Sequence, residues 1–444
     1  FEGNSSIINT ALLVLMEEFF MFKIYNLKEG IKTTNKIIND IMFLYDFRSK
    51  KTYFTRMGRS KMKFNDIILF ILNFVKKTLQ IELDDFLKKV HENDKTITKQ
   101  AFSQARRKVL PEAFIYLLDK INEGFYSVPF KKYRGYRLLA IDGTVLQLHN
   151  SEELKNTYGY IENQNAKVAR ARASALYDIE NDMIVASKLE HYRIGERETA
   201  EKLLNKLCEL GKYNDLILFD RGYPSKDFIE FIETKNFKYL MRVSTGFLKI
   251  VVNAPKEDQV IEVKHNQITL KIRVVKFKLD SGITEILITN IFDEGFSVAN
   301  FKELYFKRWA IEVKYNELKN KLQIENFTGK TQMAIEQDFY ATIYLANMVS
   351  LAKKDAERSI AEKYNDKNLK YEYKVNTNIL IGKLKDTLIT LIAINNPWKR
   401  SRMLKFIQEE IERNVIPIRP DRTFERKENR NTQMINRMNK KRAL

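Results

Sequence analysis

Short apolar runs bounded by glycine and turn residues predict a set of buried β-strands in the middle of the chain. These runs cover residues 136–148, 171–178, 183–191 and 238–243, and a further run ends at Asp220. Residues 196–210 instead carry apolar positions at helical spacing. A second helix is predicted from Ser225, a good N-cap, to about Lys235. Strands interleaved with helices predict a core of the α/β or α+β class.

The segments on either side of this core are predicted to be helical. Residues 1–127 form the N-terminal helical region, residues 128–345 form the core, and residues 346–444 form a second helical region that ends in a basic tail. Helices are expected at residues 332–360, 376–395 and 397–413. The pattern therefore predicts three parts, a mixed core flanked by two helical regions.

A long gap interrupts the core between two acidic residues. Asp220 and Glu312 lie 312 − 220 = 92 residues apart, which is too long for a plain helical connection. The gap holds strand-like runs at residues 247–252, 260–263, 268–277 and 284–291. We interpret them as a β-rich insertion at about residues 244–292.

The excess of basic over acidic residues indicates a polyanionic partner. The chain has 77 Lys and Arg against 57 Asp and Glu, a net charge of +20. The excess is clustered, both in the tail and in a stretch from Arg48 to Lys63 that has seven basic residues and no acidic one. A solvated surface or a disordered tail is the alternative. The candidate nucleic-acid contacts are Arg48, Lys50, Lys51, Arg56, Arg59, Lys61 and Lys63, with Arg106, Arg107 and Lys108 at the end of a helix predicted at residues 96–110.

Four functional side chains share one stripe of a single predicted helix. These are Tyr305, Arg308, Glu312 and Lys319, and at about 100° per residue all four lie on the same side. A carboxylate flanked by two cations and a phenol suits a phosphate substrate with a bound metal ion. The alternative is an ordinary salt-bridged helix, in which Arg308 and Glu312 form an i,i+4 pair.

Two aspartates lie in a different setting, within or at the end of apolar strand runs. Asp142 lies inside the first run and Asp220 ends a later one. A carboxylate in a buried strand is costly unless it is paired or binds a metal. Together with Glu312, the two aspartates supply three hard oxygen ligands, which suit Mg²⁺ or Mn²⁺. The alternative is that each aspartate is a turn residue before a glycine.

These blocks occur in an order that resembles a known family. Asp-Gly-Thr at 142–144 is followed by Asp-Arg-Gly-Tyr at 220–223, and then by Tyr-x-x-Arg-x-x-x-Glu with a lysine seven residues later, from Tyr305 to Lys319. The chain resembles the bacterial DDE transposases of insertion-sequence family four, whose last block is called the YREK motif. The resemblance covers roughly residues 60–430.

The resemblance implies a fold, an activity and roles for the candidate residues. It implies a ribonuclease-H-like core with a β-rich insertion, which either covers DNA over the active site or acts as a packing module. It implies a DNA transposase that acts as a homodimer on double-stranded DNA, binding terminal inverted repeats and cutting and joining them to a target. Asp142, Asp220 and Glu312 would be the catalytic acids that hold two Mg²⁺ or Mn²⁺ ions about 4 Å apart. The DNA phosphates would be bound by Tyr305, Arg308 and Lys319.

Two other functions remain open from the sequence alone. One is a metal-dependent DNA nuclease that uses the same acids without strand transfer. The other is a non-catalytic DNA-binding protein derived from a transposase. The expected location is the bacterial cytoplasm, in association with the nucleoid. The single cysteine, Cys208, excludes a disulfide framework, and Glu17 and Glu18 interrupt the only long apolar run near the N-terminus, so no membrane association is expected.

Overall fold

A computed structural model of the 444-residue chain describes residues 24–419, apart from 56–61, 74–77, 92–95, 163, 165, 212 and 365–370. The helices are α2 (Leu27–Ile38), α3 (Ile41–Phe47), α4 (Phe64–Ile71), α5 (Leu79–His91), α6 (Lys99–Arg106), α7 (Glu112–Tyr126), α8 (Glu152–Tyr158), α9 (Glu196–Glu209), α10 (Lys226–Thr234), α11 (Lys249–Val252), α12 (Val298–Lys307), α13 (Ala310–Asn320), α14 (Gln332–Tyr364), α15 (Thr377–Ala393) and α16 (Pro397–Glu412). The strands are β1 (Arg137–Gln147), β2 (Tyr160–Glu162), β3 (Lys167–Asp178), β4 (Met183–His191), β5 (Asp215–Phe219), β6 (Lys238–Arg242), β7 (Asp258–His265), β8 (Ile268–Lys278), β9 (Thr284–Thr289), β10 (Tyr373–Val375) and β11 (Val415–Pro417).

One mixed sheet runs through the middle of the molecule. Its nine strands follow the order β2-β3-β1-β5-β6-β9-β8-β7, and β4 pairs with β3. Strands β1, β5 and β6 are parallel, whereas β3 and β4 form an antiparallel hairpin beside β1. The predicted mixed α/β class is therefore confirmed, and the predicted core strands are present in the expected order.

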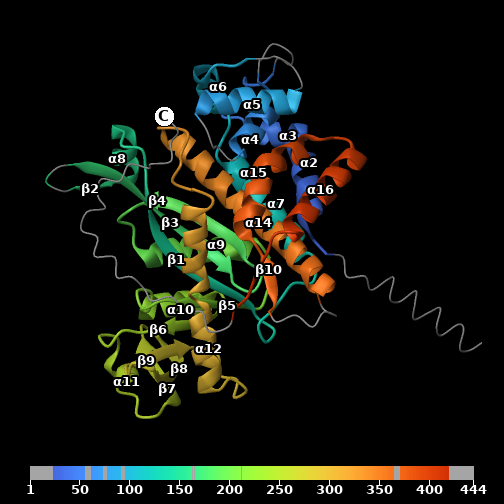
Figure 1. Cartoon of the computed structure of the whole chain (residues 1–444). Coiled ribbons are helices and arrows are strands. Elements are labelled where there is room, and N and C mark those ends of the chain that lie inside the picture. Colours follow the sequence, from blue (N-terminus) through green and yellow to red (C-terminus); the bar gives the residue numbers. More distant parts are fainter. Residues whose placement is uncertain are drawn as a thin grey trace, which may run out of the picture.

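The predicted insertion continues the core sheet rather than forming a sheet of its own. Strand β9 pairs antiparallel with β6, and β8 and β7 follow outward. Figure 1 shows this part of the sheet, with α11, at the opposite end of the molecule from helices α4, α5 and α6. Because hydrogen bonds run across the β6–β9 junction, the added strands extend the same layer that carries the candidate site.

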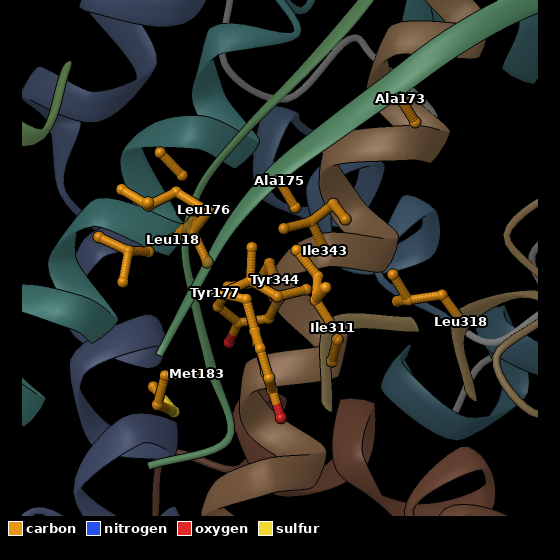
Figure 2. Packing of buried hydrophobic residues seen from close by; sticks show 14 of the residues in the cluster. Leu118, Ala173, Ala175, Leu176, Tyr177, Met183, Ile311, Leu318, Ile343 and Tyr344 are labelled. Carbon is orange, nitrogen blue, oxygen red and sulfur yellow. The ribbon is translucent and has the colours of Figure 1, made fainter. Parts of the chain in front are cut away.

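Helices cover both faces of the inner strands. Helix α9 packs on β1, β3 and β4, whereas α13 packs on β1, and α7 and α14 pack on β4. Figure 2 shows Ala173 and Ala175 of β3 in one buried cluster with Ile311 of α13 and Ile343 of α14. Small residues on β3 let these helices approach closely, and burying one branched aliphatic side chain there stabilises the fold by about 2 kcal/mol.

The helices from the two ends of the chain pack together around α14. This 33-residue helix contacts α2, α7, α15 and α16. Two buried polar contacts fix its position: the Thr34 and Tyr344 hydroxyls lie 2.6 Å apart, and the Asn347 side chain donates to Asn122 Oδ1 at 3.0 Å. The N-terminal and C-terminal regions thus form one helical unit against the sheet (Figure 1). In the described part of the chain, no helix is both long and apolar enough to cross a membrane.

Two predicted elements were wrong. Residues 247–252 do not form a strand, because Lys249–Val252 is a single helical turn that buries Val251. The stripe from Tyr305 to Lys319 lies on two helices, because α12 ends before Arg308 and α13 begins at Ala310. At this junction the backbone bonds tighten to the i→i−3 pattern, as from the Arg308 amide to the Tyr305 carbonyl (3.1 Å).

Candidate functional site

The two strand aspartates lie side by side on neighbouring parallel strands. The register pairs Leu139 with Ile217 and Ala140 with Leu218. Continuing that register by two residues places Asp142 next to Asp220, which follows β5 directly. Adjacent strands are about 4.8 Å apart, and paired residues of parallel strands point to the same face. Both carboxylates therefore belong to the same side of the sheet.

Tyr305 and Arg308, at the junction of α12 and α13, lie close to the Asp220 carboxylate. The Tyr305 hydroxyl donates to Asp220 Oδ1 at 3.1 Å. The Arg308 guanidinium lies 3.7 Å from Asp220 Oδ2 and donates to Glu312 Oε1 at 2.9 Å. The Arg308 side chain is only 5% exposed, so its charge is largely removed from solvent. Burial alone would lower the pKa of Arg308, but the charge of Asp220 offsets it and holds the pKa above its usual value.

Helix α13 is fastened to β1 beside Asp142. The Tyr315 hydroxyl donates to the Asp142 carbonyl at 2.7 Å. One helical turn on, the Lys319 ammonium donates to Thr144 Oγ1 at 2.6 Å and to the Val145 carbonyl at 3.0 Å. The sequence analysis did not identify Tyr315 as a residue of the site, because an aromatic residue at helical spacing usually belongs to the hydrophobic core. Lys319 was predicted to bind phosphate, and in this structure its ammonium lies on β1.

Asp142 carries an electrostatic cost in the folded protein. Burial is the largest cause that raises its pKa, from 3.8 to about 6, and nearby Glu196 and Glu312 add to it. The Gly143 amide and Arg308 act in the opposite direction. The local charges therefore do not compensate fully for the burial of this carboxylate, which would gain from a further cation at this point.

The first prediction concerns the stability of Asp142→Asn without metal. A folded-state pKa above the usual value means that the protonated acid stabilises the fold below about pH 4, and that this contribution is lost as the pH rises through 6. Asparagine keeps the acceptor for the Gly143 amide but never ionises. We expect the variant to exceed the wild type in unfolding free energy by about 1–2 kcal/mol at pH 8 and to match it near pH 4. Urea unfolding at both pH values, with a chelator present, measures this. An equal difference at both values would contradict the assignment.

The donor set fits a hard divalent cation. Three carboxylates are the ligands that Mg²⁺ and Mn²⁺ prefer. Among the residues that the structure describes, no group of three acidic, histidine or cysteine side chains has the spacing of a metal-binding group. Arg308 contacts two of these carboxylates, because its guanidinium pairs with Glu312 and faces Asp220. The uncompensated burial of Asp142 supports a cation at this place.

A second candidate surface joins two distant parts of the N-terminal region. The Ser49 amide donates to the Lys108 carbonyl at 2.9 Å, and the Ser49 hydroxyl donates to the Arg107 carbonyl at 3.1 Å. The ammonium groups of Lys50 and Lys108 both lie over the Tyr53 ring, 5.9 and 5.4 Å from its centre. The two basic clusters of the sequence thus form one surface, which we call the basic patch and define as Arg48, Lys50, Lys51, Arg107 and Lys108.

Some predicted DNA contacts do not belong to the basic patch. Arg106 is buried, and its guanidinium donates to Asp338 and Gln337 at 2.8 Å each, so it joins α6 to α14 rather than facing solvent. Lys63 is exposed at the start of α4. Arg56, Arg59 and Lys61 lie outside the described residues, as does the basic tail from residue 420.

Comparison with known proteins agrees with the resemblance predicted from the motifs. Residues 133–348 match the transposase DDE domain family. The transposase InsG for insertion sequence element IS4 of Escherichia coli is 23% identical over 282 residues, which cover 57% of this chain and 60% of that protein. A putative transposase for insertion sequence element IS4SA of Synechocystis is 27% identical over 167 residues, which cover 36% of this chain and 48% of that protein.

The matched segments span less than two thirds of either relative. Among solved structures, a piggyBac transposase synaptic complex with hairpin DNA has a TM-score of 0.47 and 11% identity, covering 90% of this chain and 88% of that chain. The matched family and the names of the relatives confirm the predicted resemblance to IS4-type DDE transposases.

Proposed function

We propose that this chain, which resembles the IS4-type DDE transposases, is a transposase that cuts and joins DNA at the ends of an insertion sequence. The observation that supports the proposal is the set of contacts that connects Asp142, Asp220 and Glu312. The first two share a register on parallel strands, and Arg308 links the third to Asp220. The register and Arg308 thus connect residues of the three sequence blocks, although these span 170 positions (312 − 142 = 170).

The arrangement of the inner strands supports a ribonuclease-H-like core. A hairpin of β3 and β4 lies antiparallel beside β1, and β5 and β6 follow on the other side in parallel. In our proposal the N-terminal helices carry the DNA-binding surface, residues 128–345 carry the chemistry, and the C-terminal helices support both. The enzyme would act as a homodimer on two terminal inverted repeats.

Asp142, Asp220 and Glu312 would hold the divalent ions. When bound, these ions would lower the pKa of an attacking water or 3′-hydroxyl and stabilise the leaving oxygen. Arg308 is the residue that changes partners. A DNA phosphate offers its guanidinium a bidentate acceptor, and the carboxylates of Asp220 and Glu312 are then released from it. Tyr305 orients Asp220 through its hydroxyl.

Tyr315 and Lys319 would keep α13 docked on β1 during this exchange. Tyr315 bonds the backbone at Asp142, and Lys319 bonds Thr144 and Val145 just beyond it. The helix that carries Glu312 is therefore fixed to the strand that carries Asp142. A phosphate contact by Lys319 stays a prediction, and it would require the ammonium to leave Thr144.

The test of the proposed function uses the DNA that flanks the gene. Purified protein is incubated with its terminal inverted repeats and a supercoiled target, in Mg²⁺ and in chelator. We expect nicks at the repeat ends and joined products, both only with Mg²⁺. Cleavage without joined products would favour the nuclease alternative, and specific binding without cleavage would favour the non-catalytic one.

The second prediction concerns the basic patch. Replacing Lys50, Lys51 and Arg107 with alanine removes three exposed charges. We expect weaker DNA binding and a flatter salt dependence, by a slope of about one per lost phosphate contact. The cleavage rate of the saturated complex should stay near that of the wild type, because the patch lies in the segments that directly follow α3 and α6 rather than at the acids.

The matched control removes the same charge elsewhere. Lys28, Lys32 and Lys36 are exposed lysines on α2, and their replacement with alanine lowers the net charge equally. Binding measured across a salt series should change much less in this control. Equal losses in the two triple variants would show that net charge, and not the basic patch, sets the affinity.

A further inference from the structure

An ion pair lies behind the two strand aspartates, and no sequence motif contains it. Arg172 of β3 donates from Nη1 to Glu196 Oε1 at 2.8 Å. Glu196 is the first residue of α9, and its side chain is 41% exposed, against 20% for Arg172. Arg172 also donates from Nε to the Tyr192 carbonyl at 3.4 Å, so the guanidinium is held from two directions.

This ion pair lies beside two glycines, Gly143 directly after Asp142 and Gly222 two residues after Asp220. A Cβ at Gly222 would lie 2.7 Å from Glu196 Oε2, closer than real contacts of this kind. A Cβ at Gly143 would lie 3.1 Å from Ser174 Oγ and 3.6 Å from Arg172 Nη1. Neither glycine has a positive φ, so both positions require space rather than an unusual backbone conformation.

The start of α9 also holds the segment after Asp220 directly. Arg197 donates from Nε to the Tyr223 carbonyl at 2.9 Å and from Nη2 to the Pro224 carbonyl at 3.2 Å. Glu196 and Arg197, two consecutive residues in the first turn of α9, therefore contact the segment from residue 222 to residue 224. The first of them is linked through Arg172 to the strand beside β1.

Arg172 projects from the face of β3 opposite to the one that the Asp142 side chain shares. Side chains alternate along a strand, so Gly143 and Asp142 face opposite sides of β1. Arg172 stands opposite Val145 in the register, on the same side as Gly143. The pair contacts the segments around Asp142 and Asp220, and the charge of Glu196 lies near enough to raise the pKa of Asp142. Arg308 differs, because its guanidinium faces the carboxylates of Asp220 and Glu312 directly.

We infer that Arg172 and Glu196 form a positioning pair that sets the spacing between the Asp142 and Asp220 segments and thereby the affinity of the site for divalent cations. This inference rests on the proposed function, because it takes the acids as the metal ligands. Glu196 acts as a spacer between β3 and Gly222. Residues that orient metal ligands from outside typically change metal affinity by about 10–100-fold when they are replaced.

The experiment measures Mn²⁺ binding to the full-length chain by electron paramagnetic resonance, without any cleavage reaction. Glu196→Ala removes the contacts with Arg172 and Gly222, and we expect Mn²⁺ binding to weaken about tenfold. Glu196→Gln keeps the size and the acceptor for Arg172, and its affinity should stay within about threefold of the wild type. Glu198→Ala is the matched control, since Glu198 lies in the same turn and pairs with Lys202 at the surface.

A second pair of variants tests the contact itself. Gly222→Ala places a methyl group against Glu196 and should weaken Mn²⁺ binding on its own. In the double variant that combines Gly222→Ala with Glu196→Ala, the new methyl group has no carboxylate against it. The Mn²⁺ affinity of the double variant should therefore be no lower than that of Glu196→Ala alone. Thermal unfolding of every variant separates this effect from a merely structural one, which would lower the melting temperature and leave the affinity unchanged.

The outcomes separate the inference from the proposed function. If neither the wild type nor Arg308→Ala binds Mn²⁺, the proposed metal site is wrong and the positioning pair is wrong with it. If only Arg308→Ala binds, the Glu196 variants are compared in that background. If the wild type binds and Glu196→Ala binds equally well, only the positioning pair is overturned. If Glu196→Gln weakens binding as much as Glu196→Ala, the charge of Glu196 acts instead of its spacing, and the inference is wrong in this form.

Discussion

Replacing Glu312 with glutamine is expected to reduce cleavage of terminal-repeat DNA about 10³-fold or more, while DNA affinity stays within a fewfold of the wild type. Glutamine has the size and one acceptor of glutamate but lacks the negative charge that a divalent ion requires. The same loss is expected for Asp142→Asn and Asp220→Asn, because the three carboxylates would act as one unit.

Single-turnover cleavage at saturating protein, together with binding curves in chelator, checks this expectation. Glu303→Gln is the matched control, since Glu303 is an exposed acid on α12. It should cleave at the wild-type rate. Undiminished cleavage by any one of the three acid variants would remove that residue from the catalytic site.

The second large effect is expected for Arg308→Ala, and it has two opposite parts. The guanidinium that holds Glu312 and faces Asp220 competes with a cation for the same carboxylates. Its removal should therefore strengthen Mn²⁺ binding in the absence of DNA. The cleavage rate should nevertheless fall about 10²-fold, because the contact with the phosphate is needed as charge shifts in the transition state.

Arg308→Lys provides the comparison for shape against charge. Lysine keeps the positive charge but cannot form the planar two-pronged contact of a guanidinium. We expect a rate between those of the wild type and the alanine variant, measured in single turnovers with metal saturating. A loss of DNA affinity with an unchanged rate in Arg308→Ala would mean that Arg308 only binds DNA.

The sequence predicted the local elements of the site well, because local signals define them. The apolar run around Asp142 is a strand, and Ser225 caps α10 by accepting from the Phe228 amide at 3.1 Å. It failed at residues 247–252, where β-branched residues favour a strand but the burial of Val251 is achieved by one helical turn. It also missed the short helix α8 and strand β2.

The sequence pattern could not predict contacts between elements that lie far apart along the chain. A stripe on one helix was predicted for Tyr305 to Lys319, but the helix breaks near Arg308, where the guanidinium faces Asp220 from a distant part of the chain. Arg106 reads as a surface cation, but its partner Asp338 lies 232 residues away. The pairing of Arg172 with Glu196 likewise joins a strand to a helix, and neither residue belongs to a recognisable motif.

The most direct test of the central claim is the position of bound metal. Crystals of the protein with its terminal-repeat DNA, grown in Mn²⁺, give an anomalous signal that locates the ions independently of any assay. We predict a signal at the ends of β1 and β5, with oxygen ligands from Asp142, Asp220 and Glu312, and with Arg308 turned to a DNA phosphate. Mn²⁺ bound elsewhere, or Arg308 still holding Glu312 in an active complex, would contradict this account of the site.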